Sequence, residues 1–172
     1  FHSFCNDVIT QYPESFPHII GSQPATEIDQ IRIISRIITG EQFELLRPFG
    51  DPLFYVRPAL SAIQSLKREG ISPEQYADLV VRTREEYLSR DDIYHEKGAH
   101  KGKMKSIRAN ELKRIDKNEE LSRVYRAYQQ ALFDDKLYDY ADMIMETALA
   151  LGNNEELLQS LQERFLYVLV DE

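Results

Sequence analysis

The chain has 172 residues, of which 42% are hydrophobic and 29% are charged, and its formal net charge is −8. This length suits one domain with flanking arms and supplies enough apolar residues for a buried core. Its one cysteine, Cys5, excludes an internal disulfide and favours a reducing, cytoplasmic compartment, and no apolar run approaches the roughly 18 residues of a membrane span.

The charge is unevenly distributed. Taken whole, the acidic balance argues against nucleic-acid binding. Between positions 97 and 117, however, eight basic residues stand against two acids, a local charge of +6 that leaves −14 for the rest of the chain. On charge alone two interpretations stay open, a patch that contacts a phosphate backbone or a solvated surface loop.

Helix is the dominant expected element, because glycine and proline number only seven each. Ser3 is expected to cap a first helix, and the proline-containing stretch 12–24 is expected to be a loop. Isoleucines at helical spacing predict a second helix over residues 27–38, which Gly40 ends. After an irregular stretch over residues 47–58, a short amphipathic helix should follow and stop at Gly70.

The sequence Ser72-Pro73-Glu74-Gln75 has the pattern of a helix start, with Ser72 as the N-cap and Gln75 at the capping-box position. No strong breaker follows before Gly98, which predicts a helix of about 20 residues, or about 30 Å. Glycines among the lysines then favour a helix–loop–helix tip with a mobile basic connection. An antiparallel partner helix should run from about Leu112 to Leu132.

Asp139 is expected to cap a further helix, and a last helix over residues 154–163 should lead into the apolar run 165–170. That run predicts a strand buried on both faces, as in a parallel sheet. Asp171 and Glu172 follow it, as in a Walker B element whose Asp holds magnesium and whose Glu orients the attacking water. The alternative is a core strand that simply enters a polar loop.

No Gly-x-x-x-x-Gly-Lys-Ser/Thr sequence is present, so the phosphate cradle that a Walker B element needs is absent from these residues. The chain is therefore interpreted as a piece of a larger ATPase. At the other end, Phe1 and His2 could stack a base and touch a phosphate, or Phe1 could be a core residue. The histidines His95 and His100 are five apart and do not have the spacing of a metal site.

Five stretches, in order, resemble the UvrD/Rep/PcrA family of superfamily 1 DNA helicases. Phe1-His2-Ser3 is similar to the end of a Thr-Phe-His-Ser motif, residues 137–144 to the Asp-Phe-Asp-Asp-Leu signature, and residues 165–172 to the strand and first acids of Val-Asp-Glu-Tyr/Phe-Gln-Asp. Residues 62–74 and 124–129 resemble two phrases of the helical insertion. Tyr140, Ala141 and Met143 depart from the signature but keep its apolar character or a tolerated variant.

The resemblance implies a mainly α fold: the helical insertion subdomain called 1B, with short arms of the RecA-like α/β motor domain that it interrupts. Residues 1–23 would be one arm of domain 1A, residues 24–136 the insertion, and residues 137–172 the return to domain 1A. The implied cofactors of the full-length parent are ATP and Mg²⁺, and none is expected on the fragment alone.

The predicted site has three parts. Glu172 is the catalytic residue and Asp171 holds Mg²⁺ through ATP. The DNA-binding residues are Phe1, His2, Lys97, Lys101, Lys103, Lys105 and Arg108. Asp139, Tyr140 and Asp142 belong to the signature without an assigned role.

The implied function is that of an ATP-dependent helicase moving 3′ to 5′ on single-stranded DNA in repair or recombination. Its expected partners are single-stranded and forked DNA, together with repair or recombination proteins, and no membrane. The isolated fragment should hydrolyse nothing. The alternative is a non-catalytic helical module that binds protein through its acidic surface.

Overall fold

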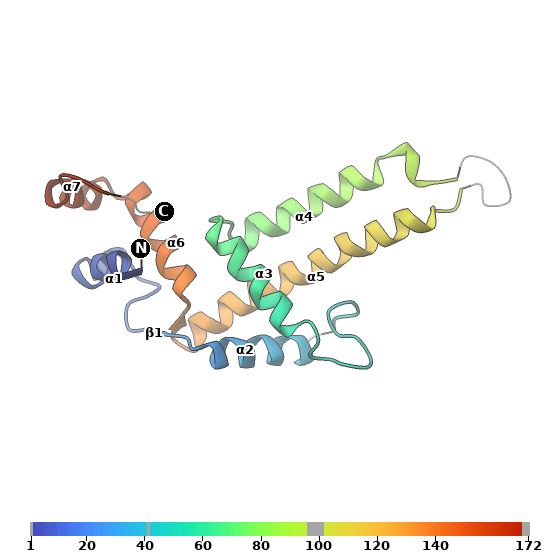
Figure 1. Ribbon diagram of the computed structural model, residues 1–172, viewed down its shortest axis with the longest axis horizontal. Coiled ribbons are helices and arrows are strands. Elements are labelled where there is room, and N and C mark those ends of the chain that lie inside the picture. The colour runs from blue at the N-terminus through green and yellow to red at the C-terminus, as the bar shows by residue number, and fades with distance from the viewer. Residues whose placement is uncertain (1, 41, 96–101, 170–172) are drawn as a thin grey trace. The chain divides into compact units, whose positions relative to one another are not determined.

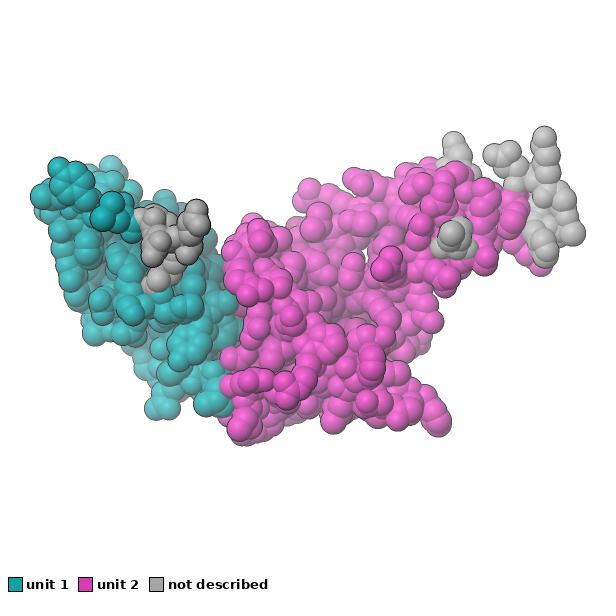
Figure 2. Space-filling view, in the orientation of Figure 1, with its two compact units in different colours: residues 1–26, 132–172 teal, residues 27–131 magenta. Residues whose placement is uncertain are grey.

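The computed structural model describes residues 2–40, 42–95 and 102–169. The chain divides into two compact units, coloured separately in Figure 2: unit 1 is Phe1–Thr26 with Leu132–Glu172, and unit 2 is Glu27–Ala131. The sequence placed the borders of the insertion at residues 24 and 136. The described residues are mainly helical, as predicted, and contain one short parallel strand pair, which the sequence did not predict.

Unit 2 is built on four helices: α2 (Glu27–Gly40), α3 (Val56–Arg68), α4 (Pro73–Leu88) and α5 (Ser106–Asp134), whose last turn contains the unit border. α2 and α3 pack against each other through apolar faces that repeat every three or four residues. The buried apolar side chains of these faces are Ile33, Ile34, Ile37, Ile38, Val56, Ala59, Leu60 and Ile63. Each large aliphatic side chain contributes about 1.5–3 kcal/mol when fully buried, so this face is a main source of stability.

A buried cation ties the corner between α3 and α4 to α5. Lys67 is 2% exposed, and its Nζ lies 5.1 Å from the centroid of the Tyr128 ring and 6.0 Å from that of Tyr125. The Tyr125 hydroxyl donates to the Ile71 carbonyl at 3.0 Å. Gly70, at φ 69°, supplies the left-handed residue that ends α3 at this corner.

The start of α4 is as the sequence predicts. The Ser72 side chain accepts from the Gln75 amide at 3.2 Å, and the Gln75 side chain accepts from the Ser72 amide at 2.9 Å. Pro73 takes the first helical position, where its missing N–H costs no hydrogen bond.

α4 and α5 run side by side in opposite directions and form an arm (Figure 1). The expected length of about 20 residues for the first of them is wrong: α4 has 16 and ends at Leu88. The backbone of Arg90 is extended, and the short 3₁₀ turn η2 (Asp91–Ile93) follows it. The Arg90 guanidinium binds the Asp92 carboxylate in this turn at 3.0 Å. Ile93 is fully buried there against Tyr87 and Ile115.

The described ends of the connection beyond η2 pair as the stem of a hairpin, and most of the expected loop lies outside the described residues. Tyr94 and Met104 form an antiparallel bridge, and the His95 amide donates to the Lys103 carbonyl at 3.0 Å. Gly102 has φ 79°, a conformation that favours glycine, and its amide donates back to the His95 carbonyl at 2.8 Å. Backbone pairing therefore brings residues 93–95 close to residues 102–105.

Unit 1 contains α1 (His2–Gln11), the 3₁₀ turn η1 (Pro13–Ser15), β1 (Gln23–Pro24), β2 (Leu137–Tyr138), α6 (Tyr140–Asn153) and α7 (Glu155–Arg164). β1 and β2 pair in parallel, and α1 packs on α6. A cluster of Val8, Phe16, Ile19, Leu157 and Leu161 forms a core. Ser3 lies inside α1, so its predicted role as the cap is wrong; among the described residues the helix already includes His2.

The predicted buried strand after α7 is not formed in the described residues. Residues 165–169 have no regular structure, and Leu166, Tyr167, Val168 and Leu169 are 77–97% exposed. A strand buried on both faces needs neighbouring strands for its backbone and layers for its side chains, and the described residues pair none with this run. Hydrophobic pattern alone could not reveal that.

No described helix combines the length and the apolar character that crossing a lipid bilayer requires.

Candidate nucleic-acid interface

The tip of the arm is held by an ion network around Arg108. Its guanidinium donates to Asp92 at 2.6 Å and to Glu111 at 2.9 Å. The Tyr87 hydroxyl donates to the Arg108 carbonyl at 2.6 Å and lies 3.1 Å from Glu111 Oε2. Arg90 binds both carboxylate oxygens of Asp92 at 3.0 Å. The end of α4, the turn after it and the start of α5 are thereby joined.

The same contacts shift the acidities of the network. Hydrogen bonds from Arg90 lower the pKa of Asp92, and the charge of Arg108 acts in the same direction. Hydrogen bonds between Arg108 and Glu111 lower the pKa of Glu111 and raise the pKa of Arg108. Burial raises the pKa of the Tyr87 hydroxyl, and its contact with Glu111 adds to that shift. Asp92, Glu111 and Arg108 are therefore favoured in their charged forms at neutral pH, and Tyr87 in its neutral form.

The predicted DNA-binding cations of the tip have different surroundings. Lys103 is exposed at the hairpin. Lys105 is half-buried, and its Nζ donates to the Asp92 carbonyl at 2.9 Å. Arg108 is the centre of the network just described, so its first contacts are within the arm. Lys97 and Lys101 lie outside the described residues.

Further along the arm, α5 carries exposed cations at Lys113 and Arg114. Two of its acids are paired with α4: Arg84 Nε lies 3.4 Å from Asp116 and 3.8 Å from Glu119. The basic side chains on this part of α5 thus face solvent while the acids are engaged by the neighbouring helix.

Asp139 and Asp142 form a capping box at the start of α6. The Asp139 carboxylate accepts from the Asp142 amide at 2.9 Å, and the Asp142 carboxylate accepts from the Asp139 amide at 3.1 Å. Both residues are buried, at 2% and 3% exposure. This geometry gives the two acids of the signature a structural role, since carboxylates also favour the positive end of a helix.

The start of α1 and this signature lie together. The rings of His2 and Tyr140 are 5.5 Å apart at 87°, an edge-to-face contact, and both residues are exposed. Phe4 and Phe165 form a similar contact at 5.7 Å. Phe1, Asp171 and Glu172 lie outside the described residues, and no cluster of three metal-ligating side chains occurs among the residues that are described.

The sequence did not predict a site in which backbone amides of one loop bind a carboxylate from a distant part of the same chain. The Glu120 carboxylate, on α5, accepts the successive amides of Glu44, Leu45 and Leu46 at 2.8, 3.0 and 2.8 Å. The partners are about 75 residues apart, and no local pattern marks a loop whose amides are satisfied by a distant acid.

These features define a predominantly helical protein with a two-helix arm, whose tip is basic in sequence and organised by arginine–carboxylate pairs. The model of the UvrD/REP helicase N-terminal domain matches residues 1–172, and the chain belongs to this family. The family predicted from the five motifs is therefore confirmed.

Among curated proteins, a probable DNA helicase of Mycoplasma pneumoniae is 49% identical over 47 residues. The match covers 27% of this chain and 9% of that relative, so the chain spans a small part of the relative that it matches. No solved structure gives a significant match.

The network at the tip should make stability depend on acid pH. Because the folded pKa values of Asp92 and Glu111 are lowered, their contribution is complete above the unfolded values of about 4 and is lost as the pH falls through the folded ones. Arg108→Met should lower the urea midpoint at about pH 6, and this difference from the unsubstituted chain should shrink towards about pH 2.5. The exposed Arg82→Met on α4 is the control. A difference that stays constant with pH would contradict the assignment.

The capping box predicts different effects for two substitutions of one residue. Asp139→Ala should lower the free energy of unfolding of unit 1 by about 0.5–2 kcal/mol, whereas Asp139→Asn should keep most of it because asparagine caps as well as aspartate. Urea unfolding followed by circular dichroism measures both, with the exposed Asp7→Ala on α1 as control. If Asn is as damaging as Ala, the charge itself is needed and capping is not the main role.

Proposed function

We propose that this chain is part of an ATP-dependent DNA helicase that moves 3′ to 5′ on single-stranded DNA in repair or recombination, and that unit 2 is the helical insertion 1B. The family match over residues 1–172 carries the proposal. Proteins of this family, as the sequence resemblance implies, interrupt a RecA-like motor domain with that insertion. Unit 1, built from both ends of the chain, would then be the part of domain 1A present here.

In this proposal the arm grips the phosphates of a forked DNA without reading its sequence. Lys97, Lys101 and Lys103 would neutralise phosphates, which makes affinity salt-dependent. Lys105 and Arg108 would support DNA binding indirectly. They bind Asp92 in the turn that precedes the hairpin and so fix the position of the hairpin. A tip fixed by several charge-assisted bonds loses less conformational entropy when DNA binds.

ATP chemistry would come from the end of the chain. Asp171 would hold the Mg²⁺ of bound ATP, and Glu172 would activate the attacking water. The phosphate-binding loop would come from other residues of the longer protein, since no such sequence occurs in this chain. His2, beside Tyr140 at the start of α1, would lie along the single strand together with Phe1.

DNA binding by the tip is tested with the double variant Lys101→Glu/Lys103→Glu. It should weaken binding of forked DNA and flatten the salt dependence, by a slope of about 0.9 for each lost phosphate contact. Lys105 is left intact because it holds the Asp92 carbonyl. Fluorescence anisotropy at several salt concentrations gives both quantities.

The matched control is Arg32→Glu/Arg126→Glu, which changes the net charge equally on exposed helical positions away from the tip. It should leave the salt slope near that of the unsubstituted chain. If the two double variants have equal effects, DNA binding depends on the net charge of the chain and not on the tip. No effect of either would favour a protein-interaction module.

The nucleotide site is tested in the longer protein that contains this chain. Glu172→Gln should lower ATP turnover by about 10²–10⁴-fold, as expected for loss of a catalytic base, while ATP binding is kept. Asp171→Asn should weaken Mg²⁺-dependent ATP binding itself. Phosphate release and nucleotide binding are measured separately, and normal turnover in both variants would refute the assignment.

A further inference from the structure

The loop between α2 and α3 exposes apolar side chains. In this loop, residues 42–55, Phe49 is 106% exposed, Phe54 58% and Leu53 49%. Leaving two phenylalanines and a leucine in water is unfavourable, and their grouping in one loop makes this loop a candidate binding surface.

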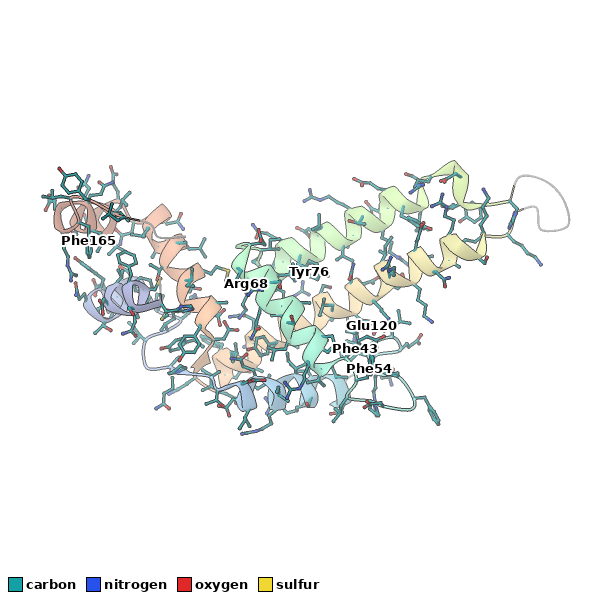
Figure 3. The ribbon with its side chains drawn as sticks, in the orientation of Figure 1. Phe43, Phe54, Arg68, Tyr76, Glu120 and Phe165 are labelled. Atoms are coloured by element: carbon teal, nitrogen blue, oxygen red, sulfur yellow. The ribbon has the colours of Figure 1, made fainter. Side chains whose placement is uncertain are left out.

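The first half of the loop is fixed to α5. The three amide bonds to Glu120 hold the backbone of residues 44–46, and Phe43 and Leu46 are each only 5% exposed. The Arg123 guanidinium lies 4.8 Å from the centroid of the Phe43 ring. Figure 3 labels Phe43 and Glu120, whose contact with the Glu44 amide fixes the base of this loop.

The second half is fixed as well. Asp51 makes a turn in which its carboxylate accepts from the Leu53 amide at 3.1 Å and its carbonyl accepts from the Phe54 amide at 3.1 Å. The Phe54 and Tyr55 rings meet edge to face at 4.9 Å. Lys117 Nζ donates to the Tyr55 hydroxyl at 2.6 Å and lies 4.4 Å from its ring centroid. Phe54 is therefore presented on a preorganised backbone, which favours binding, and Phe49 lies between the two fixed stretches.

Cations and acids are balanced in number around the rings. The cations of the loop and its supports are Arg47, Arg57, Lys117 and Arg123, and the acids are Glu27, Glu44, Asp51 and Glu120. Glu120 is occupied by three amides and Asp51 by its turn. The Arg57 side chain, 75% exposed, pairs with the 69% exposed Glu27 at 3.0 Å, a surface pair weak enough for a phosphate to displace.

We propose that this loop is a stacking platform for unpaired bases of a DNA strand, with Phe49 and Phe54 under the bases and Arg57 and Lys117 beside the phosphates. Aromatic side chains combined with cations are the usual means of holding single strands without sequence preference. The apolar groups are separated by Gly50, Asp51 and Pro52, which suits individual bases better than a continuous protein interface. The inference rests on the proposed DNA-binding function and adds a second contact to it.

The chain contains no tryptophan, so Phe49→Trp makes a reporter for this position alone. Titration with an oligo-thymidine of about 16 nucleotides, the upper end of the usual site sizes, should quench its fluorescence, because a stacked base lies against the indole. The control is Ile28→Trp, at a 71% exposed position of α2, where no quenching is expected. A duplex without single-stranded ends should quench the Phe49→Trp reporter much less.

Affinity gives the second readout. Phe49→Ala/Phe54→Ala should weaken oligo-thymidine binding by about five-fold or more for each base that loses its stacking partner. Phe49→Trp should keep full affinity, and Ile28→Ala should have no effect. Both alanine positions are exposed, so folding should be intact, which far-ultraviolet circular dichroism checks.

Three outcomes overturn the inference. If neither readout responds while Lys101→Glu/Lys103→Glu still weakens forked-DNA binding, the platform is wrong and the proposed function stands. If the chain binds no DNA in any assay, both fail. If the emission of the Phe49→Trp variant responds to chain concentration and not to the oligonucleotide, the loop is a contact between copies of the protein.

Discussion

Unit 2 depends on the continuity of one helix. α5 has 29 residues, so it is about 43 Å long. This is longer than the core of unit 2, so part of α5 extends beyond that core. Its C-terminal half buries Val124, Tyr125 and Tyr128 completely, whereas its N-terminal half contacts α4, the turn η2 and the α2–α3 loop mainly through polar side chains. The arm is the consequence, and its stability has to come from side-chain pairs between two helices and from its own tip.

The acids of α5 supply those pairs. Glu111 binds Arg108, Asp116 and Glu119 meet Arg84, and Glu120 binds three amides of the neighbouring loop. Exposed cations, among them Lys113 and Arg114, lie on the same helix. Residues 73–120, which make up the arm, carry as many acids as bases, so the positive charge of the arm is local to the stretch 97–117.

The sequence predicted helix starts that depend on contacts between residues close together in the chain. The caps at Ser72 and Asp139 each involve a partner three residues away and were predicted from the sequence. The end of α4 depends on an arginine network reaching 16 residues along the chain, and the α2–α3 loop on an acid about 75 residues away, so neither left a local pattern. The apolar run 165–169 has the sequence pattern of a strand but does not form one among the described residues. A strand also needs partner strands, and the sequence of the run does not specify them.

The two proposed DNA contacts are organised from the same helix. Arg108 holds the tip and Glu120 holds the aromatic loop, and these residues are about 12 positions apart on α5, a rise of about 18 Å along the axis. That is the length of about five base pairs of duplex. Because an unbroken helix does not stretch, the two anchors stay at a constant separation along α5. If DNA engages both proposed surfaces, this rigidity would limit how far the spacing between the two contacts can vary.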